Sequence, residues 1–402
     1  MKRIAYILGM FPVYSETFIL REILELKRKG FKVLVMARMN TQKHQLISEV
    51  IHAEAEKLMK EVYYFPELGT EMSRIQKALF HLYFLLFNPI RYLKTFFFSY
   101  RTDKETFWFF KNMVFYAMKL KRERVEHIHA HFAVDSCKFA MLISMLSGIP
   151  YSFTVHAHDI FLPEYSDLMV EKFNHSKFVV CISEYNKEYV LKHYPGINPE
   201  KTRIIHCGLD LGTFIPRDKG RNKVFTIISV GRLVEHKGFK YLIHACKILK
   251  ERKGFDFVCH IIGGGKQRQE LEEVIQKFNL IDVVHLLGAM EQTAILKALN
   301  EADLFVLPCI IEKTGNRDGI PVVLMEAMAM KTPVVSTRVS GIPEVVKDGA
   351  GILVEPEDVN GLVMAIDKVF NLSEQERQDM GKKGRTIIEK EFDLTKEVQK
   401  LG

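Results

Sequence analysis

Apolar runs alternate along most of the chain with segments whose apolar residues recur at helical spacing. Residues 2–8 form a short apolar run, and residues 17–29 follow with apolar positions three and four apart. The same order of strand and then helix recurs over 127–146, 151–173 and 178–193. Such alternation predicts an α/β fold with a parallel sheet covered by helices on both faces.

A second series of the same kind begins after a polar stretch with proline and glycine, residues 212–223. Its predicted strands are 224–230, 255–262, 283–287, 302–307 and 333–336, with helices between them. Two successive doubly wound units predict a ligand in the cleft between them, where strand carboxyl ends meet helix amino ends. We therefore expect two domains, residues 1–211 and 212–390, followed by a C-terminal segment, 391–402.

Residues 71–125 depart from this alternation, because they combine a dense aromatic cluster with a basic tail. No acidic residue occurs between Ala78 and Tyr100. Two interpretations stay open: helices that pack their aromatic side chains on the first domain, or an interfacial helix that dips into an anionic leaflet. The longest apolar stretch, 78–90, is too short to span a bilayer.

Length, charge and cysteine content limit the domain number, the ligand classes and the cellular compartment that we expect. The chain has 402 residues, which favours two domains, and 57 Lys+Arg against 49 Asp+Glu give a net charge of +8. That surplus could serve nucleic acid, anionic lipid or a phosphate-bearing ligand. The six cysteines form no CxxC pair and no signal peptide is visible, so we expect a reducing compartment and a cytoplasmic protein that does not cross a membrane.

Candidate anion-binding loops follow the first two strands of the second domain. Gly231 permits a tight turn, and Arg232 and Lys237 flank the start of the next helix, where a bound anion would gain the helix dipole and two cations. Three glycines at 263–265 permit close approach of a ligand to the backbone. A dinucleotide fingerprint would need a further glycine where Arg268 stands, so the signal for NAD is weak.

The most specific segment runs from Asp318 to Ala329. Pro321 suits a first helical turn, so the helix should open near residue 320 with Asp318 just before it. The backbone N–H groups expected at this anion site are those of Ile320, Val322 and Val323. Glu326 lies two turns along amid apolar residues, where a carboxylate is costly unless it accepts hydrogen bonds. Ligand hydroxyls could supply them; the alternative is that Glu326 caps a neighbouring loop.

Two HxH pairs, His129 with His131 and His156 with His158, invite a metal interpretation. No carboxylate or cysteine stands at ligand spacing except Asp159, and no DxD segment is present, so we predict no metal. His129 is expected to be a hydrogen-bonded histidine near a strand end.

The segment from Asp318 to Glu326, with Gly-x-Pro after its first acid and Glu-Ala-x-Ala at its end, resembles the retaining glycosyltransferases of family 4. Further matching segments are 229–233, 237–238, 263–265, 287–288, 303–308 and 340–344. One departure is that Asp318 replaces the usual glutamate. In the first domain 11–19, 129–132 and 154–159 resemble a subgroup active in bacterial exopolysaccharide and colanic-acid-type assembly.

This resemblance implies a GT-B fold, in which two Rossmann-like domains face each other across a cleft. It implies a hexosyltransferase that moves a sugar from a nucleoside-diphosphate donor to a saccharide or polyprenyl-linked saccharide acceptor, with retained configuration. No cofactor, metal or nucleic acid is implied. The acceptor would lie at the inner face of a membrane, to which the protein would bind peripherally, and residues 391–402 would return to the first domain.

Site roles follow from the same resemblance. The catalytic set comprises His156, Asp318, Arg232 and Lys237. The donor-binding set comprises Gly231, Gly264, Gly265, Gly319, Ile320, Val322, Val323 and Glu326. The acceptor side comprises Ser15, Glu16, Thr17, His131, His158 and Asp159, with Ser15 as the N-cap of the first helix. Within these sets, Arg232 and Lys237 would neutralise the leaving diphosphate and Glu326 would hold the ribose hydroxyls.

Two other function classes stay open. Because Asp318 stands where the family usually has glutamate, the chain could be a non-catalytic partner in a polysaccharide assembly complex. A nicotinamide-dependent oxidoreductase would use the same alternation, but its glycine fingerprint is incomplete.

Overall fold

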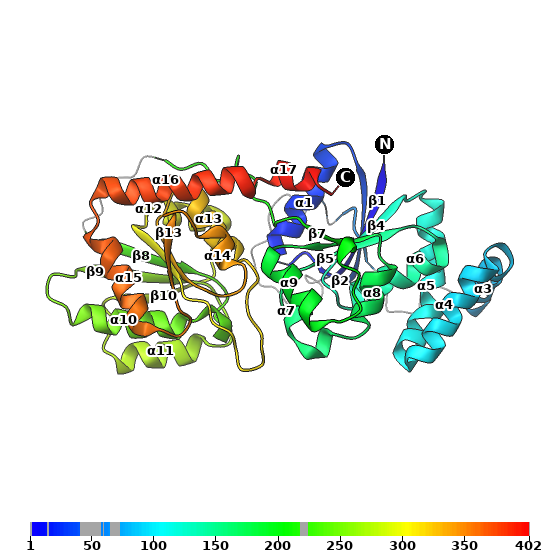
Figure 1. The fold of residues 1–402 in the computed structure, drawn as a ribbon, viewed down its shortest axis with the longest axis horizontal. Coiled ribbons are helices and arrows are strands. Elements are labelled where there is room, and N and C mark those ends of the chain that lie inside the picture. Colours follow the sequence, from blue (N-terminus) through cyan, green and yellow to red (C-terminus); the bar gives the residue numbers. More distant parts are fainter. Residues whose placement is uncertain are drawn as a thin grey trace. The chain divides into compact units, whose positions relative to one another are not determined.

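A computed structural model describes residues 2–13, 16–40, 58, 60–64, 73–217 and 224–401. The chain divides into two compact units (Figure 1). The first comprises Met1–Ile182 with Lys187–Ile205, and the second comprises Ser183–Asn186 with His206–Gly402, so that residues 391–402 fall in the second unit.

The first unit is built on a seven-stranded sheet in the order β3-β2-β1-β4-β5-β6-β7. Its strands are β1 (Arg3–Phe11), β2 (Lys32–Asn40), β3 (Tyr63–Tyr64), β4 (His127–His131), β5 (Tyr151–Val155), β6 (Phe178–Cys181) and β7 (Thr202–Ile204). Neighbouring strands pair in parallel; Ile4 of β1, for example, lies opposite both Val33 of β2 and His127 of β4. The strand order reverses at β1, which makes the carboxyl ends of β1 and β4 a topological switch point.

Eight helices of four or more residues accompany this sheet within the described residues. They are α1 (Thr17–Arg28), α3 (Arg74–Phe87), α4 (Pro89–Thr102), α5 (Lys104–Arg122), α6 (Asp135–Ser147), α7 (His158–Phe161), α8 (Met169–His175) and α9 (Glu184–His193). Local signals set the bounds of the aromatic region: Ser73 and Gln76 form a capping box before α3, Pro89 opens α4, and Asp103 caps α5.

The structure divides the aromatic region 71–125 between the two interpretations that the sequence left open. Helix α5 packs against α6, and its Phe109 and Phe110 are buried. Helices α3 and α4 lie on the outer side of α5 and α6 (Figure 1). They expose large apolar side chains, including Phe87 and Ile90 near the turn between them. On α5, Phe109, Phe110 and Tyr116 are therefore core, while Trp108 is exposed. On α3 and α4, Phe84 is buried, whereas Phe87, Phe97 and Tyr100 lie on the surface.

The second unit is a six-stranded parallel sheet in the order β10-β9-β8-β11-β12-β13. Its strands are β8 (Phe225–Val230), β9 (Phe257–Ile262), β10 (Val284–Gly288), β11 (Leu304–Leu307), β12 (Val334–Thr337) and β13 (Gly351–Val354). Its helices are α10 (Phe239–Lys250), α11 (Arg268–Lys277), α12 (Gln292–Glu301), α13 (Val322–Ala329), α14 (Ile342–Val345), α15 (Val359–Asn371), α16 (Glu374–Glu391) and α17 (Leu394–Gln399).

Strand β8 is the switch point of this second sheet, because it pairs with β9 on one side and β11 on the other. The loops that follow β8 and β11 therefore leave the sheet side by side. The predicted fold class is confirmed: both units are doubly wound, Rossmann-like parallel sheets. Short β3, β7 and β13 were not predicted. None of the described helices combines the length and hydropathy that crossing a bilayer requires.

Candidate functional site

The loops after β8 and β11 bring a cation and a carboxylate together. Nζ of Lys237 lies 3.0 Å from Oδ1 and 2.9 Å from Oδ2 of Asp318. The Cys309 thiol donates a hydrogen bond to Oδ2 of the same carboxylate at 3.3 Å. Burial alone would raise the pKa of Asp318, but the charges of Lys237 and His236 and these hydrogen bonds hold it below its usual value. Asp318 is thus an ionised carboxylate in a largely buried ion pair.

Backbone contacts explain why this pair forms. Gly238 has φ +70°, and a Cβ at this position would lie 1.8 Å from the carbonyl oxygen of Pro308. Glycine therefore allows the turn that carries Lys237 to press against the end of β11. His236 makes a second contact between the loops after β8 and β11, because its ring Nδ1 lies 2.7 Å from Oε1 of Glu312. Sequence reasoning missed both His236 and Glu312; adjacency of His236 to Lys237 was the available signal.

The glycines of the predicted donor loop have different roles. A Cβ at Gly263 would lie 1.8 Å from the carbonyl oxygen of Gly231, and one at Gly265 would lie 2.5 Å from that of Leu233. Gly264 has no atom within 4 Å of such a Cβ, so open space lies beside it. Close backbone packing therefore requires glycine at 263 and 265. Gly264 and Gly265 are exposed, and the approach of a ligand to this loop stays a prediction. A Cβ at Gly231 itself would make ordinary contacts.

Helix α13 begins at Val322, two residues after the predicted start near residue 320. Pro321 has ψ 117° and occupies the N-cap position, so the first helical residue is Val322, and Ile320 is a buried residue outside the helix. The prediction that Pro321 lies in the first turn was wrong. The N–H groups of Val322 and Val323 still belong to the first turn, where a helix supplies no acceptor for them.

Glu326 shares a helix face with that first turn. It stands three and four residues after Val323 and Val322, and all three are partly exposed, whereas Leu324 and Met325 are buried. Arg232, directly after the strand end, is exposed, and Gly319 is buried with its carbonyl accepting a hydrogen bond from the N–H of Gly341. The donor residues predicted from sequence thus lie on the loops after β8, β9 and β11 and at the start of α13.

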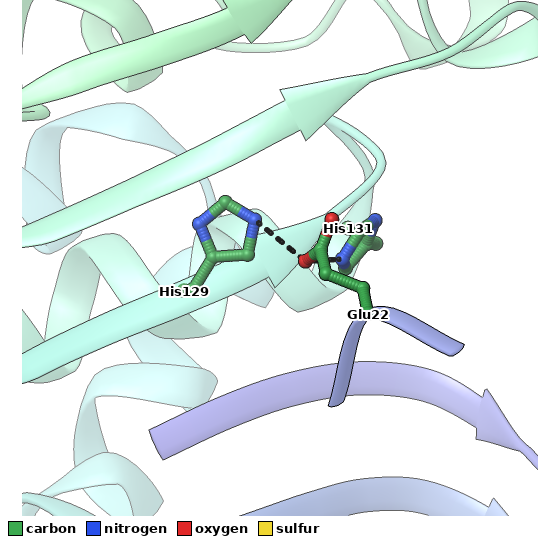
Figure 2. Close-up of side chains that lie close together, drawn as sticks. All are labelled: Glu22, His129 and His131. Carbon is green, nitrogen blue, oxygen red and sulfur yellow. Dashed lines mark hydrogen bonds and ion pairs between the residues drawn. The ribbon is translucent and has the colours of Figure 1, made fainter. Parts of the chain in front are cut away.

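The first unit holds a second cluster at the carboxyl ends of β4 and β5. Oε1 of Glu22, from α1, lies 3.1 Å from Nε2 of His131, the last residue of β4 (Figure 2). Nδ1 of His131 lies 3.0 Å from Nε2 of His156, which directly follows β5. The Tyr6 hydroxyl, from β1, donates to the same Oε1 of Glu22 at 2.5 Å. Sequence reasoning selected both histidines but missed Glu22 and Tyr6.

Burial and neighbouring charges act in the same direction on the pKa of His156 and in opposite directions on the pKa of Glu22. Burial lowers the pKa of His156 well below its usual value, and the charges of His131 and His158 lower it further. Burial would raise the pKa of Glu22, but the charge of His131 and its hydrogen bond outweigh that effect and lower it. Glu22 is therefore ionised and His156 neutral near pH 7.

His129 was expected to be a hydrogen-bonded histidine, and it is one. Its Nδ1 lies 2.8 Å from the Ser152 hydroxyl and its Nε2 lies 3.1 Å from the Thr154 hydroxyl. Burial, with the charge of His131, lowers its pKa to about 3.

The carboxylate near the HxH pair of β4 is Glu22, which corrects the expectation that Asp159 would be the nearby acid. Donor atoms of Glu22, His129 and His131 lie within 4.8 Å of one another (Figure 2). Their spacing is uneven, since Oε1 of Glu22 is 3.1 Å from His131 but 4.0 Å from His129. Asp159 is buried and accepts hydrogen bonds from the backbone N–H groups of Ala133, His156 and Ala157, so it ties the two loops together. The absence of a metal stays a prediction.

The remaining acceptor-side residues lie at helix starts. Glu16 occupies the N-cap position of α1 and Thr17 is its first residue, which corrects the expectation of Ser15 as N-cap. Ser15 itself lies outside the described residues. His158 is the first residue of α7, and its ring stacks on Phe132 at 4.9 Å.

Comparison with known proteins identifies both units. A family model described as Glycosyltransferase Family 4 matches residues 15–213, and one described as Glycosyl transferases group 1 matches residues 213–387. WcaL of Escherichia coli (strain K12), named for colanic acid biosynthesis, is 38% identical over 199 residues, which are 49% of each chain. The amylovoran biosynthesis glycosyltransferase AmsK of Erwinia amylovora is 35% identical over 199 residues, 49% of this chain and 48% of its own. The match thus spans about half the length of these curated relatives.

A solved structure agrees over the whole chain. Anabaena Alr3699/HepE, crystallised with UDP-glucose, aligns with 100% of this chain and 98% of its own at a TM-score of 0.72 and 18% identity. At that identity the likeness establishes the GT-B-type fold alone. Because the two family models cover residues 15–387 without a gap, the chain belongs to the glycosyltransferases that join a family 4 domain to a group 1 domain.

Proposed function

We propose that the protein transfers a sugar from a nucleoside-diphosphate donor, with retained configuration and without a metal, to a lipid-linked saccharide in exopolysaccharide assembly. The observation that carries this proposal is the gathering of Lys237, Asp318 and the first turn of α13 at the switch point of the second sheet. Switch points of open α/β sheets are where such folds bind nucleotides. The names of WcaL and AmsK support the polysaccharide assignment.

The second unit offers a non-metal way to stabilise a departing diphosphate. Lys237 carries three N–H donors, and the carboxylate of Asp318 engages part of that capacity. The ammonium is thereby held in place while a donor remains for a phosphate oxygen. Arg232 and the N–H groups of Val322 and Val323 would complete the anion site. Positive charge fixed in this way substitutes for a divalent ion, and Glu326, on the same face of α13, would accept hydrogen bonds from the ribose hydroxyls.

Donor binding is the first test of this function. A matching nucleotide sugar, screened in a panel that begins with UDP-glucose, should raise the melting temperature with EDTA present. At 100 times Kd the stabilisation is about 2.7 kcal/mol, or about 5–10 °C for a unit of this size. The same donor should release nucleoside diphosphate when acceptor lipid is added. If binding or turnover requires added Mg²⁺ or Mn²⁺, the metal-independent site is refuted; if no nucleotide sugar binds, so is the function.

We also propose that helices α3 and α4 bind the protein to an anionic membrane surface, where a lipid-linked acceptor resides. These helices expose apolar side chains, of which Ile75, Leu86, Phe87, Ile90 and Tyr100 are each 65% exposed or more. The cations exposed on the same helices are Arg74, Arg91, Lys94 and Arg101, and neither helix contains an acid. Apolar area and positive charge on one surface are what an anionic leaflet attracts.

Two cations of the basic tail of α5 contact aromatic rings of the same unit, and Arg122 and Arg124 of this tail are exposed. The ammonium of Lys119 lies 4.1 Å from the centre of the Tyr63 ring, and the guanidinium of Arg122 lies 5.7 Å from that of Phe80. These cations stack on aromatic rings of the same unit. Exposed residues of α3 and α4 are therefore the better targets for mutation.

Sedimentation with phosphatidylglycerol-containing vesicles tests the membrane surface. The double change Phe87→Glu with Ile90→Glu should lower the vesicle-bound fraction at least about tenfold, because each buried apolar side chain contributes about 1.5–3 kcal/mol. Ile281→Glu, at a 64% exposed position in the second unit, is the matched control and should bind as the unaltered protein does. Equal sedimentation of the double variant and the control would refute the surface.

A further inference from the structure

The cluster Glu22–His131–His156 forms a continuous chain of short contacts that the proposed roles of Lys237 and Glu326 do not use. It joins three elements, because Glu22 comes from α1, His131 ends β4 and His156 follows β5. His131 and His156 are buried, with 2% and 5% of their surfaces exposed. Side chains at such positions keep the orientation that their hydrogen bonds impose.

Each contact in this series constrains which ring nitrogen of His131 or His156 carries a proton. Nε2 of His131 faces the Glu22 carboxylate at 3.1 Å, so this nitrogen carries a proton. Nδ1 of His131 faces Nε2 of His156 at 3.0 Å, and one of these two nitrogens must donate while the other accepts. The orientation of this second hydrogen bond therefore sets which nitrogen of His156 carries its proton.

Charge balance selects the orientation. A largely buried carboxylate is costly unless a cation accompanies it, and His131 is the basic side chain in contact with Glu22 at the shorter distance. The rings of Phe18 and Phe132 pack on His156 with centroids 4.8 Å and 4.4 Å away, which keeps its surroundings apolar. A cationic His131 beside a neutral His156 satisfies both conditions.

We propose that Glu22 and His131 are positioning residues for His156: Glu22 holds His131 as an imidazolium, whose Nδ1–H donates to Nε2 of His156, so that His156 carries its proton on Nδ1. Nδ1 of His156 is then an N–H donor and not an acceptor. The catalytic consequence of this arrangement rests on the proposed glycosyl transfer. Its structural content, the tautomer of His156, does not.

Nitrogen-15 NMR of histidine-labelled protein at pH 7.5 tests the tautomer directly, with the His156 signals assigned by their absence in His156→Asn. In the unaltered protein Nδ1 of His156 should have the shift of a protonated nitrogen and Nε2 that of an unprotonated one. Glu22→Gln keeps the shape of the side chain but removes its charge. His131 should then be neutral, its Nδ1 should accept from Nε2–H of His156, and the two His156 shifts should exchange.

Ser152→Ala is the matched control, because it removes a buried hydroxyl partner of His129 on the same sheet and leaves the chain of contacts intact. It should leave the His156 shifts in place. The proposal is overturned if Glu22→Gln leaves the His156 tautomer unchanged. It is also overturned if the purified protein contains one zinc per chain that His129→Asn removes, because Glu22, His129 and His131 would then be metal ligands.

A kinetic measurement separates this proposal from the proposed function. Glu22→Gln should lower kcat for transfer about 100-fold while KM for the donor changes less than about twofold, because the orientation of His156 acts on the chemical step. A matching fall in kcat with unchanged donor affinity supports the positioning role. A large rise in KM with kcat unchanged overturns it. Should no transfer occur in the unaltered protein, the function fails while the NMR result still decides the tautomer.

Discussion

Lys237→Ala should lower kcat for sugar transfer by about 100-fold or more, because the ammonium is the buried charge best placed to stabilise the leaving diphosphate. It should also destabilise the second unit by about 3 kcal/mol, since removing one partner leaves the Asp318 carboxylate without its cation. Transfer kinetics and urea unfolding measure the two effects separately. A variant with unchanged kcat would place Lys237 outside the catalytic machinery.

The double variant Lys237→Ala with Asp318→Asn distinguishes stability from catalysis. It should recover most of the lost stability, because no unbalanced charge remains, yet it should stay as inactive as the single variant. If the double variant regained transfer, the loss in Lys237→Ala would be a folding effect and the catalytic role of the ammonium would be wrong.

The same ion pair predicts the direction of a pH effect. The pKa of Asp318 is lowered from 3.8 in the folded protein, so the pair stabilises the fold above that pH and its contribution is lost as the pH falls through the lower folded value. In Lys237→Ala, burial without the cation raises the pKa of Asp318, so the carboxylate takes up a proton earlier. The stability difference between the two proteins should therefore shrink as the pH falls from 7 toward 4.

Glu326→Ala should abolish detectable transfer and leave the fold intact. The residue is partly exposed on the face of α13 that carries Val322 and Val323, so removing its carboxylate opens no cavity in the core. Loss of the acceptor for two vicinal ribose hydroxyls should remove nucleotide-induced thermal stabilisation together with activity. Circular dichroism and the unliganded melting temperature should match those of the unaltered protein.

Glu273→Ala provides the control for Glu326. Glu273 is an exposed helical glutamate of the same unit, on α11, and its loss should change neither donor binding nor transfer. Normal turnover by Glu326→Ala, with Glu273→Ala equally active, would contradict the assignment of the ribose site.

Local patterns determined most of the fold. The spacing of apolar residues and the residues that end helices and strands predicted the two parallel sheets. Buried parallel strands are continuous apolar runs, and amphipathic helices separate them. Strands β3, β7 and β13, of two to four residues, were not predicted, because such short segments contain few positions for a period. The four-residue strands β6, β11 and β12 were predicted, because they form continuous buried apolar runs. Pro321 was misplaced by one residue, since proline suits both the N-cap and the first turn.

The candidate site residues that local sequence patterns mark could be predicted, and those that depend on tertiary packing could not. Lys237, Asp318, Glu326, His131 and His156 could be selected by residue type and motif, because each lies at a strand end or helix start that local spacing reveals. Glu22 could not, because it stands on a helix of the first unit with no motif around it, and only the packing of α1 beside β4 brings it to His131.

The amino-acid sequence by itself determined the alternation of elements, the family and the residue types available for chemistry, since these depend on neighbours along the chain. Tertiary structure alone decided which of those groups touch: the Lys237–Asp318 pair spans 81 residues and the Glu22–His131 contact spans 109. The charge of a group and the position of its proton depend on its distance from other groups and on its burial. The order of strands in the sheet sets these distances and this burial, and the spacing of apolar residues along the chain does not encode that order.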